Sequence, residues 1–131
     1  MGETYTGKVA AVVIPKNDLR NRYLIAKRCD NGEWEFPGGK QHDGESILKT
    51  AEREIKEELS LKVNAKELSE EDAYRDGGYQ IIPVMAEIIG KEFEVELVDH
   101  TDYKWVKPKE VEALDLELEN EIKCLKAFNI V

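Results

Sequence analysis

The sequence has little of what several classes of protein require. Its two cysteines, Cys29 and Cys124, are far apart and have no metal-ligand spacing, which favours reduced thiols in a cytosolic protein over a disulfide. The apolar run from Val9 to Ile14 is too short for a signal or membrane segment and suits a buried strand. Positive charge is scarce, since 19 Lys and Arg stand against 28 Asp and Glu, a net charge of −9. That balance argues against a nucleic-acid polymer as partner, because clustered Lys and Arg hold such polymers. We therefore expect a cytoplasmic protein that contacts no membrane.

The chain also lacks internal repeats, low-complexity tracts and any linker rich in Pro, Gly and Ser. Its 131 residues are enough for a hydrophobic core, so we expect one domain spanning residues 1–131. A small anionic ligand remains compatible with the negative charge if a metal ion supplies positive charge locally.

The pattern of apolar residues predicts strands interleaved with helices. Strands are expected at 8–14, 23–28, 33–36, 62–68, 79–89, 92–98 and 102–106. Helices are expected at 45–59, 108–114 and 118–128. The first two strands are expected to pair antiparallel across a turn at 17–22, and Pro83 indicates an edge strand or a bulge. This order predicts a layered α/β architecture, with helices on both faces of a mixed sheet of about five to seven strands.

The predicted helix at 45–59 has an unusual distribution of acidic residues. Its apolar stripe consists of Ile47, Ala51, Ile55 and Leu59. On a helical wheel, Glu54 and Glu58 fall about 20° to either side of Ile47, and Glu57 about 80° away. A salt-bridged surface helix explains Glu57, which can pair with Arg53, but not acids beside the apolar stripe, where repulsion and burial disfavour them. Mg²⁺ or Mn²⁺ would resolve this conflict, because hard oxygen ligands on one rigid face suit these ions.

The segment Phe36-Pro37-Gly38-Gly39-Lys40 precedes this helix and predicts a contact with phosphate. Its glycines let backbone N–H groups approach a ligand closely, and Lys40 adds a charge that suits phosphate oxygens. For this loop alone, a plain turn is the alternative interpretation. Together with the acidic helix face, it predicts a combined phosphate and metal site.

From Gly39 onward the residues resemble the Nudix box, in which Gly, Glu and the run Arg-Glu-apolar-X-Glu-Glu-X-Gly-apolar follow at fixed spacing. The matching residues are Gly39, Glu45, Arg53, Glu54, Ile55, Glu57, Glu58 and Leu61. Ser60 replaces the family's last Gly, at a position just beyond the helix where Gly usually forms a left-handed cap. We expect Ser60 to cost about 1 kcal/mol or to shift the cap slightly. The resemblance implies the Nudix fold, an α/β/α sandwich with a mixed β-sheet between helices.

The resemblance also implies a role for each residue of the box. Nudix enzymes use a divalent metal to hydrolyse a nucleoside diphosphate linked to another moiety. The implied metal ligands are Glu54, Glu57 and Glu58, with the carbonyl of Gly38 or Gly39 as a further ligand. Glu45 and Arg53 are implied to brace the loop against the helix. Two candidates for the general base remain: Glu54, by analogy, and Asp99, for which a solvated turn is an equal alternative.

Most of the chain resembles the MutT-like branch and the cytidine-triphosphate pyrophosphohydrolases near it. This likeness implies that Arg28 contacts the substrate, that Phe36 lines the base pocket and that Asn120 hydrogen-bonds an oxidised guanine. A helix N-cap is the favoured alternative for Asn120. Trp34 and Trp105 are expected in the core or at its rim. His42 and His100 are expected in solvent-exposed loops.

Three functions are compatible with the resemblance. The leading hypothesis is divalent-metal-dependent hydrolysis of a nucleoside triphosphate, ordinary or oxidised, to a nucleoside monophosphate and pyrophosphate. The second keeps the fold but changes the substrate to ADP-ribose, a dinucleoside polyphosphate or a nucleotide sugar, which the lack of a long insertion disfavours. The third is a nucleotide-binding regulator without turnover, which predicts loss of the box carboxylates that are all present here. A small-molecule nucleotide is the expected partner, for a monomer or a homodimer.

Overall fold

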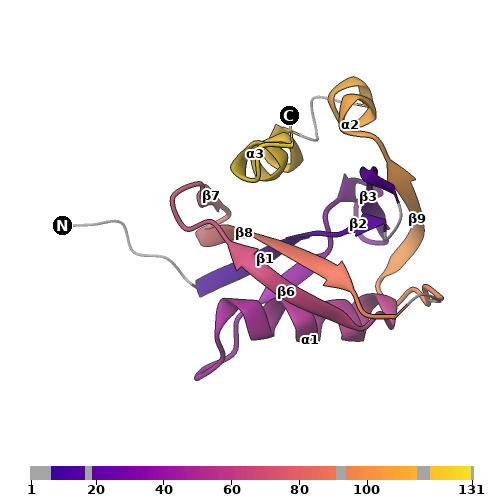
Figure 1. Ribbon diagram of the computed structural model, residues 1–131. Coiled ribbons are helices and arrows are strands. Elements are labelled where there is room, and N and C mark those ends of the chain that lie inside the picture. The colour runs from indigo at the N-terminus through magenta and orange to yellow at the C-terminus, as the bar shows by residue number, and fades with distance from the viewer. Residues whose placement is uncertain (1–6, 17–18, 91–93, 115–118, 131) are drawn as a thin grey trace.

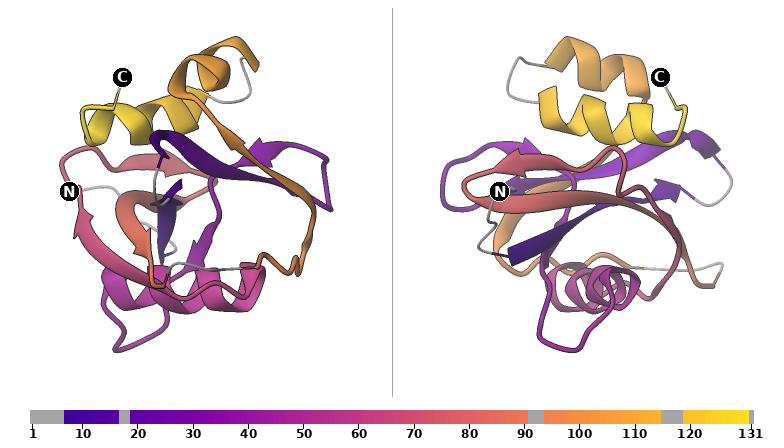
Figure 2. Two further views of the ribbon diagram at one scale, coloured as in Figure 1. Left: turned by 45° about the vertical axis from the view of Figure 1, so that its right-hand side comes forward. Right: turned by 90° about the vertical axis from the view of Figure 1, so that its left-hand side faces the viewer.

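The computed structural model describes residues 7–16, 19–90, 94–114 and 119–130 (Figure 1), with the side chains of 19–20, 112–114 and 119–122 outside the description. Sheets lie between helices in this part of the chain. Helix α1 (Ile47–Leu59) covers one side, and α2 (Pro108–Leu114) and α3 (Glu119–Ala127) lie on the other (Figure 2). This is the α/β/α arrangement that the sequence predicts. No helix within the described ranges is both long and apolar enough to cross a membrane.

The larger sheet carries the contacts with α1. Its five strands are β1 (Gly7–Val13), β5 (Gly38–Lys40), β6 (Val63–Leu68), β7 (Tyr74–Asp76) and β8 (Tyr79–Ile88). The sheet is mixed, because β1 pairs with β8 in parallel and with β5 antiparallel, while β6 and β7 pair antiparallel with β8. Alternate residues of β1 point to opposite faces, so Ala10 and Val12 pack in the core beneath α1, whereas Ala11 and Val13 pack in the core near α3.

A second sheet is built around the long strand β3 (Leu19–Arg28). Its antiparallel partners are β2 (Pro15–Lys16), β4 (Trp34–Glu35) and β9 (His100–Val106). Trp34 and Trp105, from β4 and β9, are partly buried and pack against the two cores, as predicted. Neither Cys29, which is exposed, nor Cys124, which is buried, forms a disulfide.

The predicted pairing of residues 8–14 with 23–28 is wrong. β1 pairs instead with β8, whose paired residues lie 72 positions later in the chain (Gly7 with Tyr79), and only the short β2 that follows it pairs with β3. Both faces of β1 carry buried apolar side chains, so it is stabilised most as an inner strand with a partner on each side. Turn signals between neighbouring strands do not reveal such a distant partner.

The predicted strand at 92–98 is also wrong for its described part, residues 94–98, which form no strand. The N–H groups of Glu96 and Val98 donate instead to the carbonyls of Leu59 and Glu58, at 3.0 and 2.8 Å. The last carbonyls of a helix lack partners within it, so this segment satisfies the C-terminal end of α1. By contrast, Gly38–Lys40, which we expected to be a loop, is strand β5.

Pro83 does not lie on an edge strand. β8 is an inner strand with β1 on one side and β6 and β7 on the other. Val84 pairs with Leu68 of β6 and Ile81 with Tyr74 of β7, so Pro83 falls between the stretches that pair with these two strands. Its missing N–H therefore interrupts neither ladder, and the bulge lies in β6.

Helix α1 starts two residues later than predicted, because Ser46 is its N-cap. The Ser46 hydroxyl accepts a hydrogen bond from the Lys49 N–H at 3.2 Å. At the other end Ser60 adopts the left-handed conformation, with φ 56° and ψ 25°, and its N–H donates to the Lys56 carbonyl at 3.1 Å. The usual cap thus forms without glycine.

Candidate active site

Arg53 joins α1 to the loop before it. Its Nε and Nη2 donate to the two carboxylate oxygens of Glu45, at 2.8 and 3.0 Å, and Nη2 also donates to the Lys40 carbonyl at 2.8 Å. Its Nη1 donates to Glu54 at 2.8 Å and to Glu57 at 3.1 Å. The hydrogen bonds from Arg53 lower the pKa of the Glu45 carboxyl to about 2. Arg53 therefore fixes the loop and two of the box carboxylates relative to one another.

Glu58 lies in less favourable surroundings than the carboxylates that Arg53 contacts. It is half-buried, and its Oε2 is fully buried with no hydrogen-bond partner among the described residues. Burial raises the pKa of the Glu58 carboxyl to about 8, and the nearby charge of Glu54 adds to this effect. His100 and the Gly38 N–H act in the opposite direction. A buried oxygen of this kind requires a proton or a cation as partner.

Both glycines of β5 are required by close contacts. A side chain at Gly38 would collide with the backbone carbonyl of Ala10 on the neighbouring strand β1. A side chain at Gly39 would collide with the carboxylate of Glu54. Gly38 therefore lets β5 approach the backbone of β1 more closely than a side chain would allow, and Gly39 leaves the Glu54 carboxylate in its present position.

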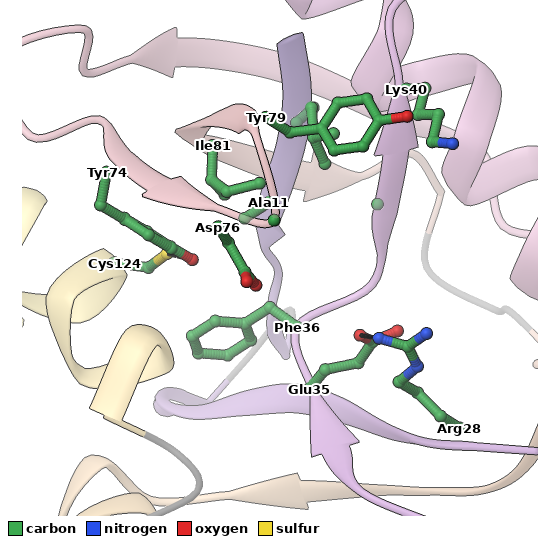
Figure 3. A pocket seen from close by; sticks show the side chains of 14 residues that line it. Ala11, Arg28, Glu35, Phe36, Lys40, Tyr74, Asp76, Tyr79, Ile81 and Cys124 are labelled. Atoms are coloured by element: carbon green, nitrogen blue, oxygen red, sulfur yellow. Dashed lines mark hydrogen bonds and ion pairs between the residues drawn. The ribbon is translucent and has the colours of Figure 1, made fainter. Parts of the chain in front are cut away.

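Two adjoining cavities open beside these residues, with volumes of about 440 and 460 Å³. We call the first the carboxylate half; its own lining residues are Cys29, Asp30, Gly39, Glu58, Asp99 and His100. We call the second the aromatic half (Figure 3); its own lining residues are Ala10, Ala11, Phe36, Tyr74, Asp76, Gly77, Tyr79, Ile81 and Cys124. Val9, Arg28, Glu35, Gly38 and Lys40 line both halves. One site therefore has an acidic end, a basic middle and an aromatic end.

Residues 6–128 match the family model of the NUDIX domain. The chain is a MutT-like member of the Nudix hydrolase family. The nucleoside triphosphatase NudI of Escherichia coli O139:H28 is 27% identical over 124 residues, which cover 82% of this chain and 88% of that protein. The 8-oxo-dGTP diphosphatase of Buchnera aphidicola is 36% identical over 59 residues, 45% of each chain.

The solution structure of the E. coli ORF135 protein shares the fold of this Nudix hydrolase. The two have a TM-score of 0.70 and 24% identity, covering 95% of this chain and 89% of that one. The family-model match over residues 6–128 includes the helices on both sides of the sheets.

The prediction that His100 lies in a solvent-exposed loop is wrong. It is not a loop residue exposed to solvent but a buried residue of β9, with 9% of its surface exposed. Its Nε2 lies 3.0 Å from Glu35, and this hydrogen bond raises the pKa of the His100 imidazole. Glu35 also lies 3.6 Å from Arg28, which pairs more closely with Asp30, at 2.6 Å. His42, by contrast, is exposed as predicted.

Most of the predicted site residues of the Nudix hydrolase gather around the two halves. Asp99 is exposed at the wall of the carboxylate half, in a left-handed conformation with φ 66°. The Lys40 ammonium lies over the Tyr79 ring, 4.7 Å from its centre.

Among the described side chains, no three of His, Cys, Asp and Glu converge closely enough to hold a metal as they stand. Glu54 and Glu57 turn to Arg53. Asn120 lies in the first turn of α3, and its side chain is outside the description.

Sequence reasoning missed most of the aromatic half, namely Tyr74, Asp76, Tyr79, Ile81 and Cys124. A signal for four of them was present. Two alternating triplets, Tyr74-Arg75-Asp76 and Tyr79-Gln80-Ile81, flank Gly77-Gly78, and such a glycine pair is typical of a two-residue hairpin turn. Cys124 comes from α3 and has no local signal of this kind.

Proposed function

We propose that this Nudix hydrolase converts a nucleoside triphosphate to a nucleoside monophosphate and pyrophosphate, with Mg²⁺ or Mn²⁺ as cofactor. The observation that carries the proposal is the buried, unpartnered Oε2 of Glu58, in the wall of a cavity that Arg28 and Lys40 also line. A carboxyl oxygen that lacks a partner and two cations in one cavity suit a metal bound together with phosphates. The name of NudI, a nucleoside triphosphatase, supports this substrate class.

The chemistry of the residues present fits a divalent ion, which would draw Glu54 and Glu57 from their contacts with Arg53. The buried oxygen of Glu58 lacks a partner. Gly39 has no side chain, and this brings β5 close to the carboxylate of Glu54. We assign Glu54, Glu57 and Glu58 as ligands, with the carbonyl of Gly38 or Gly39. The bound ion would supply Lewis-acid stabilisation of phosphate charge and activation of water.

The remaining roles belong to side chains of the chain itself. Arg28 and Lys40 line both halves of the site and are assigned to phosphate oxygens, because Arg and Lys donate strong hydrogen bonds to them. Phe36 lines the aromatic half and is assigned to the nucleobase. Arg53 and Glu45 hold the loop and α1 in position.

Two further roles are those of the general base and of a second contact to the nucleobase. Asp99, exposed at the wall of the carboxylate half, and Glu54, bound to Arg53, are the two candidates for the general base. Asn120 is assigned to the nucleobase by family resemblance. The substrate is then a small nucleotide, and the enzyme a cytoplasmic monomer or homodimer.

The test is incubation of the purified protein with Mg²⁺ and a panel of nucleotides. Pyrophosphate and monophosphate from triphosphates, ordinary or oxidised, would support the proposal. AMP from ADP-ribose, or cleavage of a dinucleoside polyphosphate or nucleotide sugar instead, would replace the substrate and keep the chemistry. Binding of nucleotides without any product would make the protein a non-catalytic regulator.

The metal assignment has its own test. Glu57→Gln and Glu58→Gln should each lower kcat at least roughly 100-fold at fixed Mg²⁺, because each removes a charged ligand. Glu71→Gln, at an exposed position outside both cavities, is the matched control and should leave kcat unchanged. Full turnover by Glu57→Gln or Glu58→Gln would remove the altered residue from the ligand set.

A further inference from the structure

The hairpin formed by β7 and β8 makes one wall of the aromatic half. Asp76 pairs with Tyr79, and Tyr74 with Ile81, on either side of Gly77-Gly78. Both glycines have positive φ, 56° and 86°, which a type I′ turn requires of its two central residues. Directly paired residues, and residues two apart on one strand, point to the same face of a hairpin. The side chains of Tyr74, Asp76, Tyr79 and Ile81 therefore lie together, and all four line the cavity.

Asp76 is the acidic member of this row, and its carboxylate points into the cavity, in the space framed by Tyr74 and Phe36 (Figure 3). Among the described residues, its side chain makes no hydrogen bond or ion pair. Glu35, the other acid that lines this half, is already held by His100 and lies near Arg28. Asp76 is therefore the carboxylate of the aromatic half that remains available to a ligand.

The surroundings of Asp76 indicate which part of a nucleotide it would meet. Arg28 and Lys40, the cations suited to phosphate, line the junction of the two halves. Phe36 and Tyr74 supply aromatic surface in the aromatic half, and nucleobases are typically held by stacking on such side chains and by hydrogen bonds to the base edge. With phosphates at the junction, the base lies beside Asp76.

We propose that Asp76 selects guanine over the other nucleobases. A carboxylate accepts hydrogen bonds and cannot donate them. Guanine offers a ring N–H beside its amino group and can donate to both oxygens, whereas cytosine and adenine offer one amino group beside a ring nitrogen that only accepts. Uracil and thymine also offer a single donor, their ring N–H, beside carbonyl oxygens that would face the second carboxylate oxygen without a hydrogen between them. The inference rests on the proposed hydrolysis of nucleotides and names the base it acts on.

The experiment compares kcat/KM for GTP, CTP, ATP, UTP and dTTP at one Mg²⁺ concentration. We expect the wild type to prefer GTP over UTP, CTP and ATP by about tenfold or more, because only guanine can donate to both carboxylate oxygens. In Asp76→Asn the ratio of GTP to UTP should fall toward one, because an amide both donates and accepts and so can meet a carbonyl oxygen. Asp72→Asn is the matched control and should keep the wild-type ratio. Asp72 precedes β7, accepts from the Ser69 hydroxyl at 2.5 Å and lines neither cavity.

Two results would overturn the inference. One is an unchanged ratio of GTP to UTP in a folded Asp76→Asn protein, and the other is a change in the ratio of GTP to dGTP alone, which would assign Asp76 to the sugar. If the wild type cleaves no nucleotide, the proposed hydrolysis fails. The same ratio is then measured from the dissociation constants of non-hydrolysable GTP and UTP analogues, so that the two failures are distinguishable.

Discussion

At the scale of single residues, Ser60 is where this chain departs from the Nudix box. It holds the left-handed cap of α1 with φ 56°, a conformation that glycine adopts at no steric cost. Ser60→Gly is expected to raise the free energy of unfolding by up to about 1 kcal/mol, because the left-handed strain is removed. The change should appear as a higher denaturant midpoint, with kcat unaltered.

Ser46 at the other end of α1 gives the opposite expectation. Its hydroxyl accepts from the Lys49 N–H at 3.2 Å, so Ser46→Ala leaves that donor without a partner. The free energy of unfolding should fall by about 1 kcal/mol, measured in the same denaturant series. Equal shifts of one sign in the two variants would contradict the assignment of both caps.

Glu45 is expected to make the free energy of unfolding depend on pH in the acidic range. Hydrogen bonds from Arg53 lower the pKa of its carboxyl from 4.5 to about 2, so its contribution is complete above about pH 4.5 and is lost as the pH falls toward 2. Glu45→Gln should therefore destabilise the protein at pH 7, and its difference from the wild type should shrink between pH 4.5 and 2. Unfolding curves at several pH values measure this, with Glu71→Gln as the charge-matched control. A difference that stays constant down to pH 2 would show that the ion pair contributes nothing.

At the scale of elements, β5 contains two adjacent glycines that serve different contacts. A side chain at Gly38 meets the backbone of Ala10, which cannot move aside without breaking the pairing of β5 with β1. A side chain at Gly39 meets only the end of the flexible Glu54 side chain. The first glycine is thus required by the fold, and the second by the position of a carboxylate.

Alanine substitutions at these two positions should therefore separate stability from activity. Gly38→Ala is expected to lower the free energy of unfolding by roughly 1–3 kcal/mol, as overpacking typically does. Gly39→Ala should change stability less but lower kcat by up to roughly 100-fold, because it displaces Glu54. Thermal unfolding and steady-state kinetics of both variants provide the measurement. Loss of kcat without loss of stability in Gly38→Ala would reverse the assignment.

The same elements show how far local sequence carries a prediction. α1 was predicted within two residues and its acidic face correctly, because both depend on spacing within one helix. The partner of β1 and the course of residues 94–98 were predicted wrongly, because each depends on contacts with distant residues. β1 pairs with β8, and residues 94–98 contact the end of α1. The strand at β5 was missed because Gly-Gly reads locally as a turn, whereas Gly38 and Gly39 are needed for close packing.

At the scale of the whole molecule, the site lies where the two sheets and α1 meet. Glu58 comes from α1, Gly38 from the larger sheet, and Arg28 and His100 from the smaller one. The box residues were found from sequence because they follow one another at fixed spacing. The sequence did not reveal the burial of His100 or the aromatic half. Both arise only when β9, the β7–β8 hairpin and α3 come together.

This arrangement predicts that metal binding stabilises the whole fold. An ion that binds only the folded chain raises the free energy of unfolding by RT ln(1 + [L]/Kd), about 2.7 kcal/mol at a concentration 100 times Kd. Mg²⁺ should therefore raise the Tm of the wild type in the absence of any nucleotide. Glu58→Gln keeps the size of the side chain but cannot become an anionic ligand, so its Tm should rise much less, whereas the Tm of Glu71→Gln should rise as in the wild type. An equal rise in Glu58→Gln would mean that the ion binds elsewhere, and the buried oxygen of Glu58 would then need another partner, such as a proton.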